Sequence, residues 1–305
     1  MKAFFGMLLA SFREWQKDKA SSQAAALSYY TIFSLAPIVV IVLTLLGWIY
    51  REGDVSSLFI AQVAGLVGES GSEVFKSIIE AANKPATSTW AAVISAVTAL
   101  FGATGVFVQL KDALNTAWGV KEARFQGLKG LVRVRAVSLT GVLVIGFLLL
   151  VSLFISTGIS AATARLSSTN AIVAVLIQIL NQAISIGLIM LLFAFIFKFL
   201  PDVKVAWKDV WIGALFTSVM FNLGKFLIGL YLGNSNVGSS FGAAGSILVL
   251  LVWVYYSAQI VLFGAEFTQV YSDRYGSRSI SGTRKRQTGN VKISVVKDGP
   301  SQTKT

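Results

Sequence analysis

The chain has 305 residues, of which 55% are hydrophobic and only 13% are charged. Soluble globular domains carry roughly 25% charged residues, so the composition excludes an ordinary soluble fold. Cys and His are absent from the sequence, which excludes disulfides, thiolate chemistry and imidazole metal ligands. The net charge of +12 would suggest a nucleic-acid partner in a soluble protein, but in a membrane protein it reports topology.

Residues 1–27 are predicted to form an amphipathic cytoplasmic segment. Its apolar residues recur at helical spacing: Phe4, Phe5, Leu8, Leu9, Phe12 and Trp15. Such a helix is expected to lie on the surface of the membrane. Charged residues follow without a small-residue cleavage site, so we expect the segment to remain on the mature protein.

Six apolar stretches follow, each long enough to cross the hydrocarbon core of a bilayer. They predict an all-α, polytopic membrane helix bundle with six transmembrane helices and short amphipathic interfacial helices. The spans are expected at about 28–50, 88–110, 136–156, 171–199, 210–232 and 243–265, inside a transmembrane domain over 28–271. Pro37 lies in the first span and predicts a local kink there.

The first connection, 51–87, is too long for a simple turn and contains two apolar stripes at helical spacing. It is predicted to form two short amphipathic helices that cap the external face. Residues 272–305 are polar and basic, and are predicted to be a disordered cytoplasmic tail. Its basic cluster Arg284, Lys285 and Arg286 has the character of a contact with anionic lipid headgroups or nucleic acid, although retention of positive charge in the cytoplasm is enough to explain it.

The distribution of positive charge predicts the orientation. With Lys198, at the cytoplasmic end of the fourth span, counted in the connection that follows it, the two termini and the even-numbered connections carry 21 Lys and Arg. The odd-numbered connections carry 4, and Lys225 lies within a span. Positively charged loops stay in the cytoplasm. Both termini are therefore predicted to be cytoplasmic.

Lys225 is a charge inside the fifth span, where insertion costs on the order of 2.5–3.5 kcal/mol. One interpretation is a polar cavity that attracts an anionic group. Its candidate members are Lys225, Asn222, Gln178, Asn181 and Gln182. The alternatives are that Lys225 extends its ammonium to the interface and that the amides only join helices through hydrogen bonds.

A second polar layer is expected at the cytoplasmic ends of the spans, with the role of a gate or helix clamp. Its candidate members are Glu266, Lys111, Asp112, Lys198, Tyr29 and Tyr30. Tyr and Lys are ordinary interface anchors, but a carboxylate gains nothing from anionic headgroups. Pairing with Lys111 or Lys198 would offset the cost of Glu266.

Three segments resemble the YihY/BrkB family of bacterial inner-membrane proteins. They are AAALSYYTIFSLAP in the first span, the pattern Trp211, Gly213, Thr217, Lys225, Phe226 and Tyr231 in the fifth, and LVWVYYSAQIVLFGAEF in the sixth. The resemblance covers residues 10–271 and implies six spans in the bacterial inner membrane. The family has carried the label of a tRNA-processing ribonuclease, ribonuclease BN, and has been linked to virulence and to envelope or lipid phenotypes.

The residues argue against the ribonuclease label, because RNA hydrolysis uses clustered carboxylates or His, and this chain has scattered acids and no His. No catalytic residue, metal ligand or cofactor motif is identified, so none is predicted. The leading hypothesis is transport or translocation of a lipid-like or anionic solute; the alternative is an envelope structural or assembly protein. The expected partners are membrane lipids and such a solute rather than nucleic acid, and oligomerisation stays open.

Overall fold

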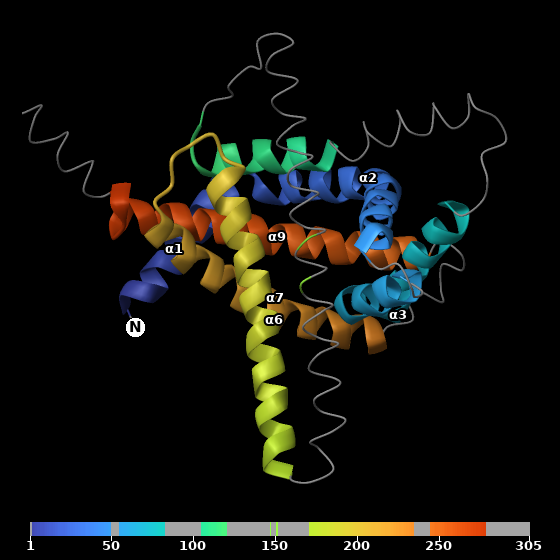
Figure 1. The fold of residues 1–305 in the computed structure, drawn as a ribbon. Helices are drawn as coiled ribbons and strands as arrows, with labels where there is room; N and C mark the ends of the chain where they lie inside the picture. Colours follow the sequence, from blue (N-terminus) through green and yellow to red (C-terminus); the bar gives the residue numbers. More distant parts are fainter. Residues whose placement is uncertain are drawn as a thin grey trace, which may run out of the picture.

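The computed structural model describes residues 2–49, 55–82, 105–120, 171–234 and 245–278, together with the single residues 147 and 151. Within these ranges the chain is helical and contains no strand. The labelled helices are α1 (Lys2–Lys17), α2 (Ala20–Ile49), α3 (Val55–Ala82), α6 (Ala171–Phe199), α7 (Trp207–Asn234) and α9 (Gly245–Arg274) (Figure 1). A further helix covers 105–117.

Four of the described helices are long and apolar enough to cross a membrane: the segments Ala20–Thr44, Gln182–Phe199, Trp207–Ile228 and Gly245–Arg274. They correspond to the predicted first, fourth, fifth and sixth spans. The predicted second and third spans lie mostly outside the described residues. The structure describes only 105–110 of the second span, which begin the helix over 105–117, and the single residues 147 and 151 of the third. The structure thus confirms an all-helical membrane fold within the described ranges, and the count of six spans stays a prediction.

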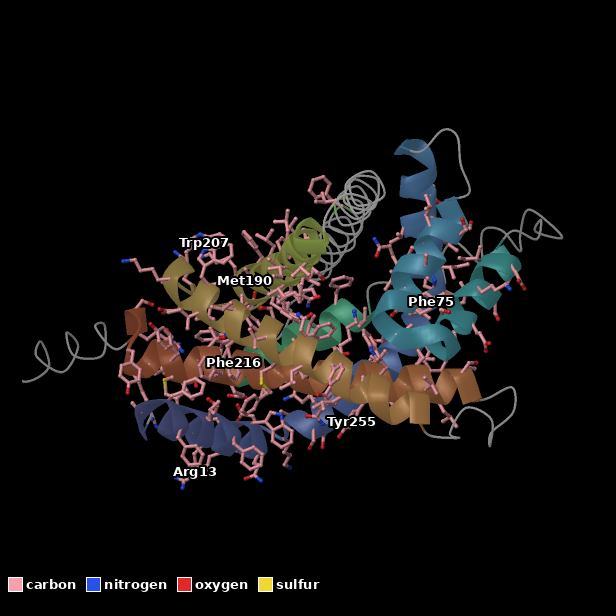
Figure 2. The ribbon with its side chains drawn as sticks, turned by 90° about the horizontal axis from the view of Figure 1, so that it is seen from below. Arg13, Phe75, Met190, Trp207, Phe216 and Tyr255 are labelled. Atoms are coloured by element: carbon pink, nitrogen blue, oxygen red, sulfur yellow. The ribbon has the colours of Figure 1, made fainter. Side chains whose placement is uncertain are left out.

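Helix α9 lies at the centre of the molecule and is contacted by α1, α2, α3 and α7 (Figure 1). Helix α6 packs on α7 through its C-terminal half, where Phe193 meets the ring of Phe221 at a centroid distance of 5.7 Å. The N-terminal half of α6 extends away from the other helices (Figure 1). Figure 2 shows Phe216 of α7 between Met190 of α6 and Arg13 of α1, and Phe75 of α3 at the other end of the molecule.

Helices α7 and α9 pack against each other through two Gly-Thr contacts. A Cβ atom added at Gly213 would collide with Thr268, and one added at Gly264 would collide with Thr217. Because the residue number rises along α7 as it falls along α9, the two helices are antiparallel. Each Thr hydroxyl donates to the carbonyl four residues earlier on its own helix, at 2.7 Å for Thr217 and 2.6 Å for Thr268. Each Thr hydroxyl therefore has a hydrogen-bond acceptor on its own helix, so that small and hydroxyl-bearing residues can pack closely between the two membrane helices.

Helix α3 contains two helical arms that meet at Gly68, which has a φ of +80°. Glycine reaches this φ without steric cost, so the break occurs there. The two arms carry the apolar stripes that the sequence predicts: Phe59 and Phe75 are buried on them and pack with Val39 of α2 and Leu250 of α9. Figures 1 and 2 show α2 bending toward its C-terminal end, as Pro37 within it allows.

Helix α1 is amphipathic, as the sequence predicts, and lays one face on α9. Met7 and Ser11 are buried in that contact, and the Phe4 ring meets the Phe267 ring edge-on. The opposite face exposes Phe5 and Phe12. The helix is therefore attached to the bundle while it still presents an apolar face of its own.

Candidate functional site

Lys225 is half-buried on α7 and forms no hydrogen bond or ion pair with the described residues. Asn222, one turn earlier, donates one amide N–H to the Ser218 carbonyl of its own helix at 2.8 Å. Gln182 is exposed on the half of α6 that extends away from the bundle (Figure 1). The side chains of Gln178 and Asn181 lie outside the described residues. The predicted cavity around Lys225 therefore stays a prediction, because two of its five candidate side chains lie outside the described residues.

Lys111 is buried and forms an ion pair with Asp202 at 2.9 Å, in the connection between α6 and α7. Asn115, one turn along the same helix, donates to Asp202 Oδ2 at 3.1 Å and accepts from the Asp202 backbone N–H at 2.7 Å. The helix over 105–117 is thereby fastened to this connection. Asp202 and Asn115 are 87 positions apart in the sequence, so no local sequence pattern predicts that their side chains pair.

The other predicted gate residues do not converge on Glu266. Lys198 donates to the Val205 carbonyl and lies over the Trp207 ring, 5.3 Å from its centroid. Tyr29, Tyr30 and Asp112 are exposed. Glu266 forms neither a hydrogen bond nor an ion pair within the described ranges, so the pairing with Lys111 or Lys198 that we considered from the sequence is not present.

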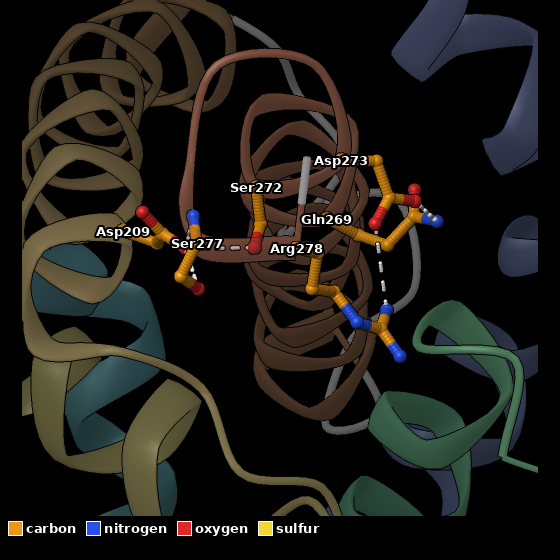
Figure 3. Close-up of polar contacts among 6 residues, drawn as sticks. All are labelled: Asp209, Gln269, Ser272, Asp273, Ser277 and Arg278. Carbon is orange, nitrogen blue, oxygen red and sulfur yellow. Dashed lines mark hydrogen bonds and ion pairs between the residues drawn. The ribbon is translucent and has the colours of Figure 1, made fainter. Parts of the chain in front are cut away.

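Asp209 is a buried polar centre that sequence reasoning grouped with the scattered acids. It lies in the first turn of α7, where the helix dipole favours a carboxylate. Its Oδ2 accepts from the hydroxyl of Ser272 at 2.7 Å, the hydroxyl of Ser277 at 2.8 Å and the backbone N–H of Ser277 at 3.1 Å (Figure 3). The chain after α9 is thus held against the start of α7.

Figure 3 also shows a more exposed cluster on the same end of α9. Gln269 donates to Asp273 at 2.8 Å, and Asp273 lies 3.7 Å from the guanidinium of Arg278. That guanidinium lies over the Trp118 ring, 5.3 Å from its centroid. These contacts link α9 to the segment that follows the helix over 105–117.

Glu266 is 1% exposed, and its Oε2 has no hydrogen-bond partner in the described structure. Gln259 Oε1 and Gln269 Oε1 are likewise buried without a partner. Spacings of seven and three residues place all three side chains on one face of α9. The sequence singled out Glu266 as an acid in need of an explanation, but it did not identify the two Gln residues beside it.

Charged groups of α1 and the following turn lie near Glu266. Lys17 of α1 pairs with Glu14 at 2.5 Å, and this hydrogen bond raises the pKa of the Lys17 ammonium. Partial burial raises the pKa of the Asp18 carboxyl, and Lys17 opposes that effect. The charges of Glu14, Lys17 and Asp18 therefore act on the carboxyl group of Glu266.

The arrangement suits binding of protons or small polar groups better than metal chemistry. Within the described ranges, no three acidic side chains converge as a set of metal ligands. What α9 does offer is a row of acceptor oxygens inside an apolar bundle, and buried acceptors of this kind bind donors.

Comparison with known proteins identifies the family. The model of the family described as Virulence factor BrkB matches residues 11–288. A UPF0761 membrane protein of Psychrobacter sp. is 27% identical over 87% of this chain and 48% of its own length. One from Pseudomonas aeruginosa is 27% identical over 81% and 58%, and one from Tolumonas auensis is 25% identical over 91% and 88%.

The chain thus spans about half the length of the first of these relatives. No solved structure matches it. The family match covers most of the sequence, and the matched relatives are described as membrane proteins, in agreement with the long apolar helices. This membrane protein therefore belongs to the Virulence factor BrkB family.

Proposed function

We propose that the protein transports or translocates an anionic or lipid-like solute across the bacterial inner membrane. The observation that carries the proposal is the environment of Lys225. This ammonium is half-buried within an apolar helix, and the described residues supply neither an anion nor an acceptor for it. Ionisable residues inside membrane segments commonly mark the paths of substrates or ions.

An anionic group is the ligand that compensates such a charge. A phosphate or carboxylate supplies several acceptor oxygens to an ammonium, and hydrogen bonds to charged groups contribute about 1.5–3 kcal/mol each. A lipid headgroup and a free anion share this chemistry, so flux measurements with each are needed to separate them. A merely structural Lys225 would instead extend its ammonium to the headgroup region and need no ligand.

The test is flux in proteoliposomes that contain the full chain, measured once with a fluorescent anionic lipid and once with a small radiolabelled anion. Lys225→Met should reduce flux at least about tenfold, the change that follows from losing one charge-assisted hydrogen bond of about 1.5 kcal/mol. Lys225→Arg should retain only part of the activity, because a planar guanidinium replaces a compact ammonium. Lys204→Met, which removes an exposed lysine, is the matched control and should leave flux unchanged.

Unchanged flux in Lys225→Met at normal membrane abundance would show that Lys225 is only an interface anchor. Wild-type protein that moves neither probe would favour the alternative, an envelope structural or assembly protein. Flux with the lipid alone, or with the anion alone, assigns the substrate class.

A further inference from the structure

Three buried acceptor oxygens on one face of α9 have no donor within the described structure. They are Gln259 Oε1, Glu266 Oε2 and Gln269 Oε1. A buried polar atom without a hydrogen bond destabilises the folded protein, and an unpaired buried charge destabilises it more. Three such atoms on one face of α9 therefore indicate that a hydrogen-bond donor is supplied to this face.

The face is closed by apolar packing rather than by polar partners. One turn before Glu266, Leu262 packs with Ala20 and Ala24 of α2 and with Ala113. One residue after it, Phe267 meets Phe4 of α1. Helix α2 contains no charged residue along its whole length. Neither α2 nor this apolar contact therefore offers a positive charge to the carboxylate of Glu266.

The charged groups that act on Glu266 come from α1 and the turn after it: Glu14, Lys17 and Asp18. Lys17 is already paired with Glu14 at 2.5 Å, on the exposed side of α1. From the helix over 105–117, Lys111 is paired with Asp202. On α7, the carboxylate of Asp209 already accepts hydrogen bonds from Ser272 and Ser277. The surroundings of Glu266 thus contain more negative than positive charge.

We propose that Glu266 is a proton-binding site, which exchanges its proton with solvent on the side of Glu14 and Asp18. A proton on Oε2 converts this atom from an orphan acceptor into a donor. Gln269 lies three residues later, where side chains of one helix are neighbours. Its amide nitrogen donates to Asp273, which leaves its Oε1 free to accept. A single proton therefore satisfies two of the three orphan oxygens.

A metal cation fits this face less well than a proton does. Alkali and divalent cations need several oxygens converging on one point. Gln259 is seven residues from Glu266, which is about 10 Å along the helix axis. Glu266 and Gln269 alone would leave most of a metal's coordination shell empty, whereas a proton needs only two oxygens.

The test is infrared spectroscopy of the purified full chain in lipid nanodiscs, without any solute. At neutral pH the spectrum should contain a carboxylic-acid C=O band that Glu266→Gln removes and that weakens as the pH is raised. Glu266→Asp should shift this band instead of abolishing it. Glu80→Gln, which removes an exposed carboxylate of α3, is the control and should leave the band intact.

A wild-type spectrum with no acid band that depends on Glu266 would overturn the proposal. A band that disappears on addition of Na⁺ at constant pH would overturn it as well, because the site would then bind a metal cation. If Glu266→Gln fails to fold, the shift in Glu266→Asp and the pH titration of the wild type decide the question. These measurements use no transported solute, so failure of the transport proposal would leave them unaffected.

Discussion

Gly213 and Gly264 show how single residues set the distance between the two central helices. Each lies directly against a Thr of the other helix, in the sequences GALFT on α7 and GAEFT on α9. The similarity of the two sequences is matched by the reciprocal contact. The third residue of each differs, however: Leu215 is exposed, whereas Glu266 is buried.

Gly213→Ala should destabilise the protein by about 1–3 kcal/mol, since the new methyl group collides with Thr268 in a close-packed contact. The measurement is the midpoint of thermal unfolding in detergent. Gly187→Ala is the matched control, because this α6 glycine has open space at its Cβ position. The control should keep or raise the midpoint, as Ala favours helix more than Gly does. Equal effects of the two substitutions would contradict the close packing of α7 on α9.

At the scale of elements, α9 is held at its C-terminal end by Asp209 of α7. Of the three hydrogen bonds to Asp209 Oδ2, one comes from Ser272 in the last turn of α9 and two come from Ser277 just beyond the helix. A buried carboxylate that accepts three hydrogen bonds holds this end of α9 firmly, since hydrogen bonds to charged groups are stronger than those between neutral groups.

Asp209→Ala should release residues 275–278, at a local cost on the order of 3 kcal/mol. Trypsin should then cleave after Arg274 and Arg278 faster than in the wild type, as followed by mass spectrometry. Asp209→Asn should have a smaller effect, because its amide oxygen can occupy the position of Oδ2. Asp273→Asn removes an exposed ion pair, which contributes little, and should cleave at the wild-type rate. Wild-type cleavage of Asp209→Ala would show that other contacts hold this end.

At the scale of the whole molecule, the arrangement of charge predicts how the protein sits in the membrane. Reporters fused after residue 271 or within 119–130 should register as cytoplasmic, and a reporter near residue 70 as external. The physical reason is the division of 21 against 4 positive residues between alternate connections. Each fusion is made with two reporter enzymes, one active only in the cytoplasm and one active only outside it. The two activities at one fusion site then control for each other. An external signal after residue 271 would overturn the six-span topology.

The apolar segments were predictable from the sequence, because the membrane imposes their length and composition on each helix separately. Helix α6 has the predicted bounds 171–199, and the predicted amphipathic pattern of α1 and the two stripes of α3 both appear in the structure. Glu266 was recognisable for the same reason, since a carboxylate in such a segment stands out whatever its surroundings.

Its partners were decided only by the tertiary structure. Lys111 and Lys198 were equally plausible neighbours by depth, yet Lys111 pairs with Asp202 and Lys198 with the Val205 carbonyl. The rotation of α9 about its own axis decides which groups Glu266 faces. Contacts with α7 through Gly264 and Thr268 turn Gln259, Glu266 and Gln269 toward the apolar meeting point of α1 and α2. The depth of a residue in the membrane follows from its position along one helix. The direction in which its side chain points depends instead on how several helices pack together.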